Sequence, residues 1–246
     1  MFPDTGQESC WERYIQNKKE QICRNRTMEI SMKMIQKKIS MIITGLTMSI
    51  LLVGFATRFD AAGYVKGILN NIYLDNSAEY RESVEISMED AHEEYLRGLE
   101  AEADFLIQYY GIDGGVSEDV HQEIAALYQE IYKASRFEVS DAVAVGADYR
   151  VDVIVSPMDI FINSEKDILT EVETFFSSAD PEKYEKQQKL NDEVAMIVVD
   201  TIRGNLSELG YQEPVTITVM VEINENGYYS IDNDALKQIG QLMIAY

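Results

Sequence analysis

One long apolar stripe constrains the fold of this chain more than any other feature. Apolar side chains recur every three or four positions from Tyr80 to Tyr110, the spacing that gathers them on one face of a helix. The stripe consists of Tyr80, Val84, Met88, Ala91, Tyr95, Leu99, Ala103, Leu106 and Tyr110. It predicts one helix of roughly 30 residues that ends at Gly111.

A second amphipathic helix follows directly. Asp113-Gly114-Gly115 is typical of a turn, and Ser117 begins a segment whose apolar face is Val120, Ile124, Leu127, Tyr128 and Ile131. Two amphipathic helices joined by a glycine-rich turn predict a helical hairpin. Upstream of it, Asp60 to Tyr73 reads as a shorter helix with Tyr64, Ile68, Leu69 and Ile72 on one face.

The apolar period then changes from that of a helix to two, which indicates strands. Phe137, Val139, Val143 and Val145 precede Gly146-Ala147-Asp148, and Tyr149, Val151, Val153 and Val155 follow it. The two runs predict a β-hairpin, with Pro157 ending its second strand. A clean alternation from Val215 to Ile223 predicts another strand. The turn Asn224-Glu225-Asn226-Gly227 then returns the chain through Tyr229 and Ile231.

Helical patterns fill the remaining segments. They cover Ser164 to Ser178, Pro181 to about Leu209 and Asp232 to Tyr246, with Asp180 and Asp232 as expected caps. The resulting order predicts an α+β fold. We expect a helical hairpin and a small antiparallel sheet of three to four strands with helices packed on one face, preceded by a signal or anchor helix.

Charge divides the chain into three parts. Residues 1–38 carry eight basic and five acidic side chains, residues 39–57 carry none, and residues 58–246 carry 13 basic and 38 acidic ones, a net charge of −25. Such an acidic part repels phosphate backbones, so we expect no nucleic-acid partner. About 185 residues without low-complexity sequence suffice for one core, and 58–246 is expected to be a single domain.

The charge-free run 39–57 has the features of an export segment. It is just long enough to cross a bilayer as a helix, and Lys33, Lys37 and Lys38 flank it on its N-terminal side only. The positive-inside rule then places the N-terminus in the cytoplasm and the acidic domain outside. A buried core helix is the alternative.

Whether the run is a cleaved signal or a retained anchor stays open. Small residues at Gly54 and Ala56 suit cleavage after Ala56. Translation from Met28, Met32 or Met34 would make residues 1–31 a mis-assigned extension rather than a cytoplasmic segment. Both cysteines, Cys10 and Cys23, lie there, so the domain would need no disulfide formation.

The sequence predicts no catalytic, cofactor-binding or metal-ligating residue, and no cofactor. The sequence has no Walker loop, dinucleotide fingerprint or Gly-x-Ser-x-Gly motif, and its two histidines, His92 and His121, lack ligand spacing. Asp113-Gly-Gly and Asp232-Asn-Asp234 resemble calcium loops but are better explained as a turn and a cap. The tyrosines could line a ligand groove, but at helical or strand spacing such residues more often lie at the edge of the core. They are Tyr109, Tyr110, Tyr128, Tyr132, Tyr149, Tyr228 and Tyr229.

Two segments carry a family resemblance. Phe59-Asp-Ala-Ala-Gly-Tyr-Val-Lys-Gly-Ile-Leu-Asn-Asn-Ile-Tyr73 and Tyr149-x-Val-Asp-Val-x-Val155 resemble a group of exported lipoproteins of unknown function from gut clostridia. The resemblance implies an extracytoplasmic α+β domain of the cystatin/NTF2-like class. The sequence departs from the group at Phe55, which follows Leu52-Val53-Gly54 where the lipidated cysteine is expected.

These observations predict a non-enzymatic, extracytoplasmic binding module of a Gram-positive cell surface, with an unknown surface protein or small ligand as its partner. Two alternatives remain. One is a small-ligand pocket protein or hydrolase on an NTF2-like cone. The other is a partner of a membrane complex, tethered through residues 39–57.

Overall fold

Helices and strands account for most of the chain that is described. The computed structural model describes residues 59–246, apart from residues 85, 113, 185 and 226. Its helices are α3 (Ala61–Leu74), α4 (Ala78–Val84), α5 (Met88–Tyr109), α6 (Glu118–Tyr132), α7 (Ile160–Ser178), α8 (Gln187–Asn205) and α9 (Asn233–Met243). Its strands are β1 (Arg136–Val139), β2 (Val143–Val145), β3 (Asp148–Ser156), β4 (Val215–Ile223) and β5 (Tyr229–Ile231). Short 3-10 turns, Pro181–Tyr184 and Leu206–Glu208, flank α8.

The strands form one antiparallel sheet around β3. Its order is β1-β3-β4-β5, and β2 pairs with the same edge of β3 as β1 does. Alternate side chains of the two long strands are buried: Val151, Val153 and Val155 of β3, and Val219 and Val221 of β4. Because paired residues of adjacent strands share a face, these five valines form one apolar surface.

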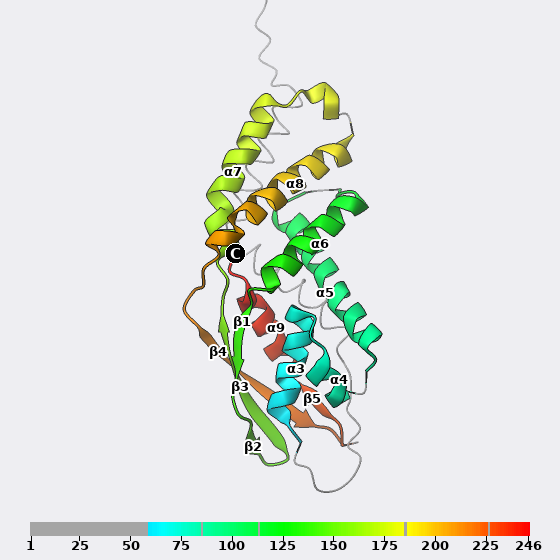
Figure 1. Ribbon diagram of the computed structural model, residues 1–246, viewed down its shortest axis with the longest axis vertical. Coiled ribbons are helices and arrows are strands. Elements are labelled where there is room, and N and C mark those ends of the chain that lie inside the picture. The colour runs from blue at the N-terminus through cyan, green and yellow to red at the C-terminus, as the bar shows by residue number, and fades with distance from the viewer. Residues whose placement is uncertain (1–58, 85, 113, 185, 226) are drawn as a thin grey trace, which may run out of the picture.

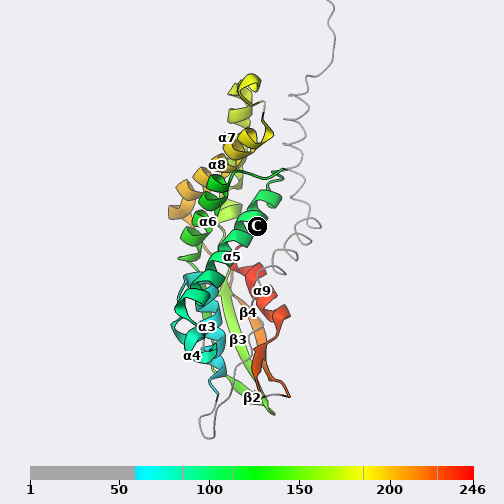
Figure 2. The same cartoon turned by 90° about the vertical axis from the view of Figure 1, so that its right-hand side faces the viewer.

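Helices cover that apolar face. α3 and α9 contact the sheet directly, and α5 and α6 pack against each other and against α3 (Figures 1 and 2). The α5–α6 pair is the predicted helical hairpin, and its turn uses Gly111, Gly114 and Gly115 at positive φ. The α+β prediction is therefore confirmed, with helices on one face of the sheet.

A second helical hairpin lies at the far end of the molecule. α7 and α8 pack together and extend beyond the sheet, opposite the end where β2 lies (Figure 1). α8 also contacts α6, which connects this hairpin to the rest of the core. The molecule is consequently long, with β2 and the α7–α8 pair at its two ends.

The prediction of one helix from Tyr80 to Tyr110 is wrong. The stripe is divided between α4 and α5, and α5 begins after Ser87, whose hydroxyl oxygen accepts a hydrogen bond from the backbone N–H of Asp90 at 3.0 Å. Met88, expected on the buried stripe, is 66% exposed. The apolar spacing continued through the break, but the serine cap competes with helix continuation at that point.

The predicted first strand of the β-hairpin is also divided, which gives the sheet five strands instead of three or four. β1 pairs with β3 in the register Val139↔Val153, whereas β2 pairs in the register Val143↔Arg150, so one extra residue lies between them. Such a bulge moves all following side chains to the opposite face. Val143 and Val145 therefore face solvent, 49% and 47% exposed.

Several element boundaries match their predicted signals and others move. Ser117 and Asp232 precede α6 and α9 as predicted. α7 starts four residues before the expected Ser164, and the predicted helix from Pro181 begins with a 3-10 turn before α8. The expected extension 1–38, export segment 39–57 and both cysteines lie outside the described residues.

Candidate functional site

A surface groove between β1 and the α3–α4 pair is the best candidate site in the described part of the chain. It has a volume of about 420 Å³ and is lined by Asp60, Ala62, Gly63, Lys66, Glu79, Glu82, Ser83 and Val139. Its lining is predominantly polar, with three carboxylates and one ammonium group. A site of this size accommodates a small ligand or a few side chains of a partner.

The N-terminal turn of α3 forms one wall of this groove. Asp60 caps the helix, and its Oδ1 accepts a hydrogen bond from the backbone N–H of Gly63 at 2.9 Å. This bond holds the Asp60 carboxylate at the helix end, where the positive end of the helix dipole favours a negative charge.

The opposite wall comes from α4, which crosses α3 at very close range. A Cβ at position 67 would lie 2.6 Å from the backbone nitrogen of Tyr80, so only glycine permits this approach. Gly67 thereby brings Glu79 and Glu82 of α4 beside the exposed side of α3.

Glu79 is held by two donors from α3. The Lys66 ammonium donates to Oε1 at 2.8 Å, and the Asn70 amide donates to Oε2 at 2.7 Å. The Lys66 hydrogen bond is the largest influence on Glu79 and lowers the pKa of that carboxyl below its ordinary value, with burial acting in the opposite direction. Glu79 is thus an ionised, bridging group, and it has no histidine or cysteine beside it among the groove residues.

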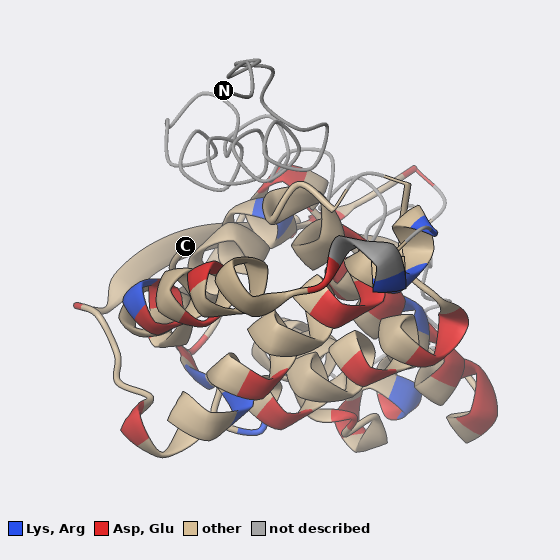
Figure 3. Ribbon diagram, turned by 90° about the horizontal axis from the view of Figure 1, so that it is seen from above, with Lys and Arg blue, Asp and Glu red and all other residues tan. Residues whose placement is uncertain are grey.

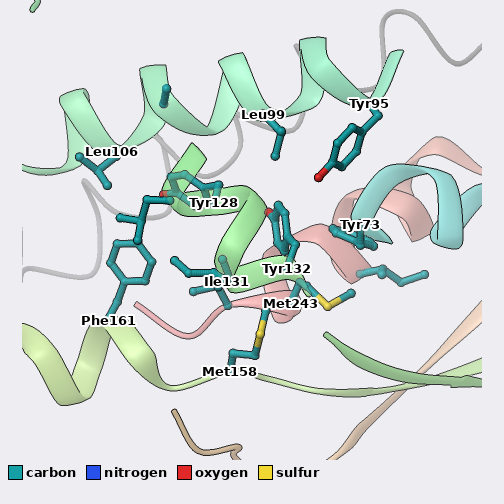
Figure 4. Close-up of a cluster of buried hydrophobic side chains, with 14 of the residues drawn as sticks. Tyr73, Tyr95, Leu99, Leu106, Tyr128, Ile131, Tyr132, Met158, Phe161 and Met243 are labelled. Atoms are coloured by element: carbon teal, nitrogen blue, oxygen red, sulfur yellow. The ribbon is translucent and has the colours of Figure 1, made fainter. Parts of the chain in front are cut away.

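Most members of the tyrosine cluster lie in the core, so the structure favours the core interpretation of their spacing over the ligand groove. Tyr110, Tyr128, Tyr132 and Tyr229 are 7% exposed or less. Figure 4 shows Tyr128 and Tyr132 between α5 and the layer that contains Met158 and Met243. Spacing alone could not separate a buried phenol from a surface one, since both fit an amphipathic pattern.

Buried polar contacts organise these phenols. Tyr132 donates a hydrogen bond to the carboxylate of Glu102, which is 3% exposed, and the hydroxyls of Tyr128 and Tyr246 lie 3.0 Å apart. Burial is the main cause that raises the pKa of Tyr128, Tyr132 and Tyr246 well above the ordinary value. The network is a polar component of the core rather than a groove open to ligand.

Both histidines lie within hydrogen-bonding distance of an aspartate near the surface. His92 Nδ1 is 2.8 Å from Asp75 Oδ1, and His121 Nε2 is 3.1 Å from Asp104 Oδ1. Among the described residues, no three or more His, Cys, Asp or Glu side chains are arranged to hold a metal ion.

The calcium-like sequences have structural explanations where they are described. The Asp232 carboxylate accepts from the backbone N–H of Asp234 at 3.0 Å and caps α9. Gly114 and Gly115 adopt positive φ in the turn after α5, and the Gly115 carbonyl accepts from the Asn191 amide at 2.8 Å.

Acidic side chains are spread over the molecule rather than gathered at one site. Seen from the α7–α8 end, Asp and Glu recur on most helices in view, with fewer Lys and Arg among them (Figure 3). None of the helices within the described ranges is both long and apolar enough to cross a membrane.

Comparison with known proteins gives one structural relationship. No protein-family model matches the sequence, and no curated protein matches it. The fold is similar to the crystal structure of YcdA, a predicted lipoprotein of Bacillus subtilis subsp. subtilis strain 168, with a TM-score of 0.54 and 14% sequence identity. The match covers 76% of this chain and 56% of YcdA, so this chain spans little more than half of that protein. At this identity the comparison establishes a shared fold.

Proposed function

We propose that this protein is an extracytoplasmic binding module held at, or released from, the surface of a Gram-positive cell. The observation that carries the proposal is the fold shared with a predicted lipoprotein. The domain also follows a charge-free run that has the sequence features of an export segment. We expect binding rather than catalysis, because Glu79 of the groove is already held by Lys66 and Asn70, and the groove residues include no paired nucleophile and base.

The sequence before Phe59 supports the location. Lysines on one side of residues 39–57 and a strongly acidic domain on the other fit a cytoplasmic N-terminus and an exported domain. The acidic surface also argues for a protein, cationic or polar partner and against nucleic acid.

A topology experiment tests this proposal. Intact cells that express the full chain with a C-terminal tag are treated with protease. We expect the protease to remove the tag from cells that have not been lysed. When Lys33, Lys37 and Lys38 are replaced by Glu, we expect the tag to be protected from the protease. The matched control replaces Lys183, Lys186 and Lys189, which lie in the exported part, and should keep the tag outside. A tag protected in intact cells and found in the cytosol would refute the location. The intact mass of the mature chain decides between a cleaved signal and a retained anchor.

A small-ligand pocket protein is the second candidate, and the 420 Å³ groove favours it. Its three carboxylates suit a cationic ligand, so spermidine is a practical first probe. A ligand that binds only the folded state raises its stability. We expect spermidine to raise the unfolding temperature less in Glu82→Gln than in Glu171→Gln, an exposed site on α7. Equal shifts in both variants would indicate diffuse charge screening and remove this candidate.

The narrower family relationship is also part of the proposal. Residues 59–73 support kinship with the exported lipoproteins of gut clostridia, and α3 and α9 on one face of an antiparallel sheet support the cystatin/NTF2-like class. A role as the tethered partner of a membrane complex fits the same observations. Copurification of the full chain with another protein from the membrane fraction would favour that role.

A further inference from the structure

The bulge between β1 and β2 leaves two apolar side chains exposed at one end of the molecule. Val143 and Val145 are 49% and 47% exposed and lie on the face of the β2–β3 hairpin turned away from the helices. Arg150 pairs with Val143 across the hairpin and is also exposed. Two exposed valines beside an arginine on one small surface combine apolar area with a phosphate-binding cation. We call Val143, Val145 and Arg150 the tip surface.

The folded chain enters this same end of the molecule. Phe59 stacks on Tyr229, with ring centroids 4.0 Å apart and an interplanar angle of 11°, and lies 6.0 Å from the ring of Tyr149. Tyr149 pairs with Ala144, the residue between the two exposed valines. Tyr149 lies on the same face as the buried Val151. Aromatic packing therefore fixes Phe59 at the tip end of the molecule, on the face of the hairpin opposite the tip surface.

Chain length then limits how far the export segment can be from the tip surface. Residues 39–57 end two positions before Phe59, and two extended residues span at most about 7 Å. If the segment stays in the bilayer, the chain leaves the membrane within that distance of Phe59.

We propose that the tip surface lies against the outer leaflet of the membrane, so that the module rests on the lipid with its α7–α8 hairpin pointing away from it. This rests on the proposed function, in its form with residues 39–57 retained as an anchor. Figures 1 and 2 show β2 at the opposite end of the long axis from α7 and α8. The distal hairpin then becomes the part presented to partners outside the cell.

The chemistry of the tip surface suits a lipid interface. Transfer of valine side chains from water to the acyl-chain boundary lowers the free energy, and an arginine can extend its guanidinium to the phosphate groups. Asp148 pairs with Val145 and lies on the same face of the hairpin. Its carboxylate accepts a hydrogen bond from the backbone N–H of Ile223 at 3.0 Å, which holds this negative charge at β4. Because the domain is strongly acidic, neutral phosphatidylcholine is the appropriate test bilayer.

Depth-dependent quenching tests the proposal on the full chain. A Cys10→Ser/Cys23→Ser background carries a single Val145→Cys labelled with an environment-sensitive fluorophore and is reconstituted into phosphatidylcholine vesicles. Some lipids carry a nitroxide near the headgroup end of the acyl chain. The matched control is Ile162→Cys on α7, which is 43% exposed and lies beyond the other end of β3. Interfacial side chains enter the bilayer by ~5–10 Å. We therefore expect the fluorophore at position 145 to be quenched at least about twice as strongly as the one at position 162. Val143→Asp should lower the quenching at 145, and Glu171→Gln should not.

Two results separate this inference from the proposed function. If the chain remains in the vesicle fraction but positions 145 and 162 are quenched equally, the tip surface does not contact lipid and this inference fails alone. If the mature chain from cells has lost residues 39–57, or does not associate with membranes, the tethered form fails and the inference fails with it.

Discussion

At the residue scale, one glycine that lets two helix backbones come close together decides where the groove walls lie. Gly67 lets α4 cross α3 so closely that a Cβ would lie 2.6 Å from the Tyr80 backbone nitrogen. Gly98, in contrast, lies in α5 with nothing within 4 Å of the position of an added Cβ. The two helical glycines therefore differ in their effect on stability. Packing requires Gly67, whereas Gly98 only lowers the helix propensity of α5.

This contrast gives a matched pair of variants. Gly67→Ala should destabilise the protein by about 1–3 kcal/mol, because the backbone of α4 has to move. Gly98→Ala should stabilise it by ~0.5–1 kcal/mol through helix propensity alone. Urea unfolding of the full chain in a non-ionic detergent measures both. Similar effects of the same sign at the two positions would contradict the close crossing of α3 and α4.

The buried phenols predict a loss of stability in alkali. Burial raises the pKa of Tyr64 from 10.0 to about 12 and raises those of Tyr110, Tyr128 and Tyr132 as well. The folded state therefore holds protons that the unfolded state releases. This contribution is fully present below pH 10 and is lost as the pH rises from 10 toward 12, at up to ~1.4 kcal/mol per pH unit for each such phenol. Tyrosinate absorbance and circular dichroism, followed together, should show the buried tyrosines ionising only as the fold is lost. Complete ionisation near pH 10 with an unchanged spectrum would contradict their burial.

At the scale of elements, caps decide where helices begin even when the apolar spacing continues. Ser87 caps α5 through its side chain, with the Asp90 N–H at 3.0 Å. Ser117 precedes α6 in the same extended conformation but makes no side-chain cap hydrogen bond. Its backbone N–H instead donates to Asp192 at 2.7 Å, a contact that does not depend on the serine side chain.

The two serines provide a second matched pair. Ser87→Ala should destabilise the protein by ~1 kcal/mol, because one backbone N–H of α5 loses its acceptor. Ser117→Ala should have a clearly smaller effect. Thermal unfolding measures both, and an equal loss would mean that the Ser87 cap does not hold the α4–α5 break.

At the scale of the whole molecule, acidic charge is the dominant electrostatic feature. The chain has a formal net charge of −22, and the described residues form few ion pairs. Most of these pairs have at least one exposed partner, as in Lys66–Glu79 and Arg203–Glu123. Surface pairs of this kind contribute little each. Repulsion among carboxylates therefore opposes the compact state.

Salt should relieve this repulsion. Raising NaCl from about 0.01 to 0.15 M shortens the Debye length from ~30 to ~8 Å, and the unfolding temperature should rise by several degrees over this range, since ~1 kcal/mol corresponds to roughly 2–4 °C at this size. Most of the rise should be complete by about 0.15 M. A rise that begins only at higher concentrations would reflect salting-out of apolar surface instead of screening.

Local patterns in the sequence determined the main elements. Three of these patterns depend only on neighbouring residues: the helical period after Ser117, the alternation from Val215 to Ile223 and the Asp232 cap. Together they determined the α+β class. The charge-free run and its lysines likewise predict export without reference to the fold, and that prediction awaits its own experiment.

Only the tertiary structure decided the features that depend on distant contacts. The bulge between β1 and β2 reverses the faces of Val143 and Val145, because β3 sets the register on both sides of it. The burial of Tyr128 and Tyr132 depends on the layers that enclose them, and the groove exists because Gly67 admits the backbone of α4. Spacing along a chain tells which side chains share a face. Which face meets a neighbour is set by packing between elements that are remote in sequence.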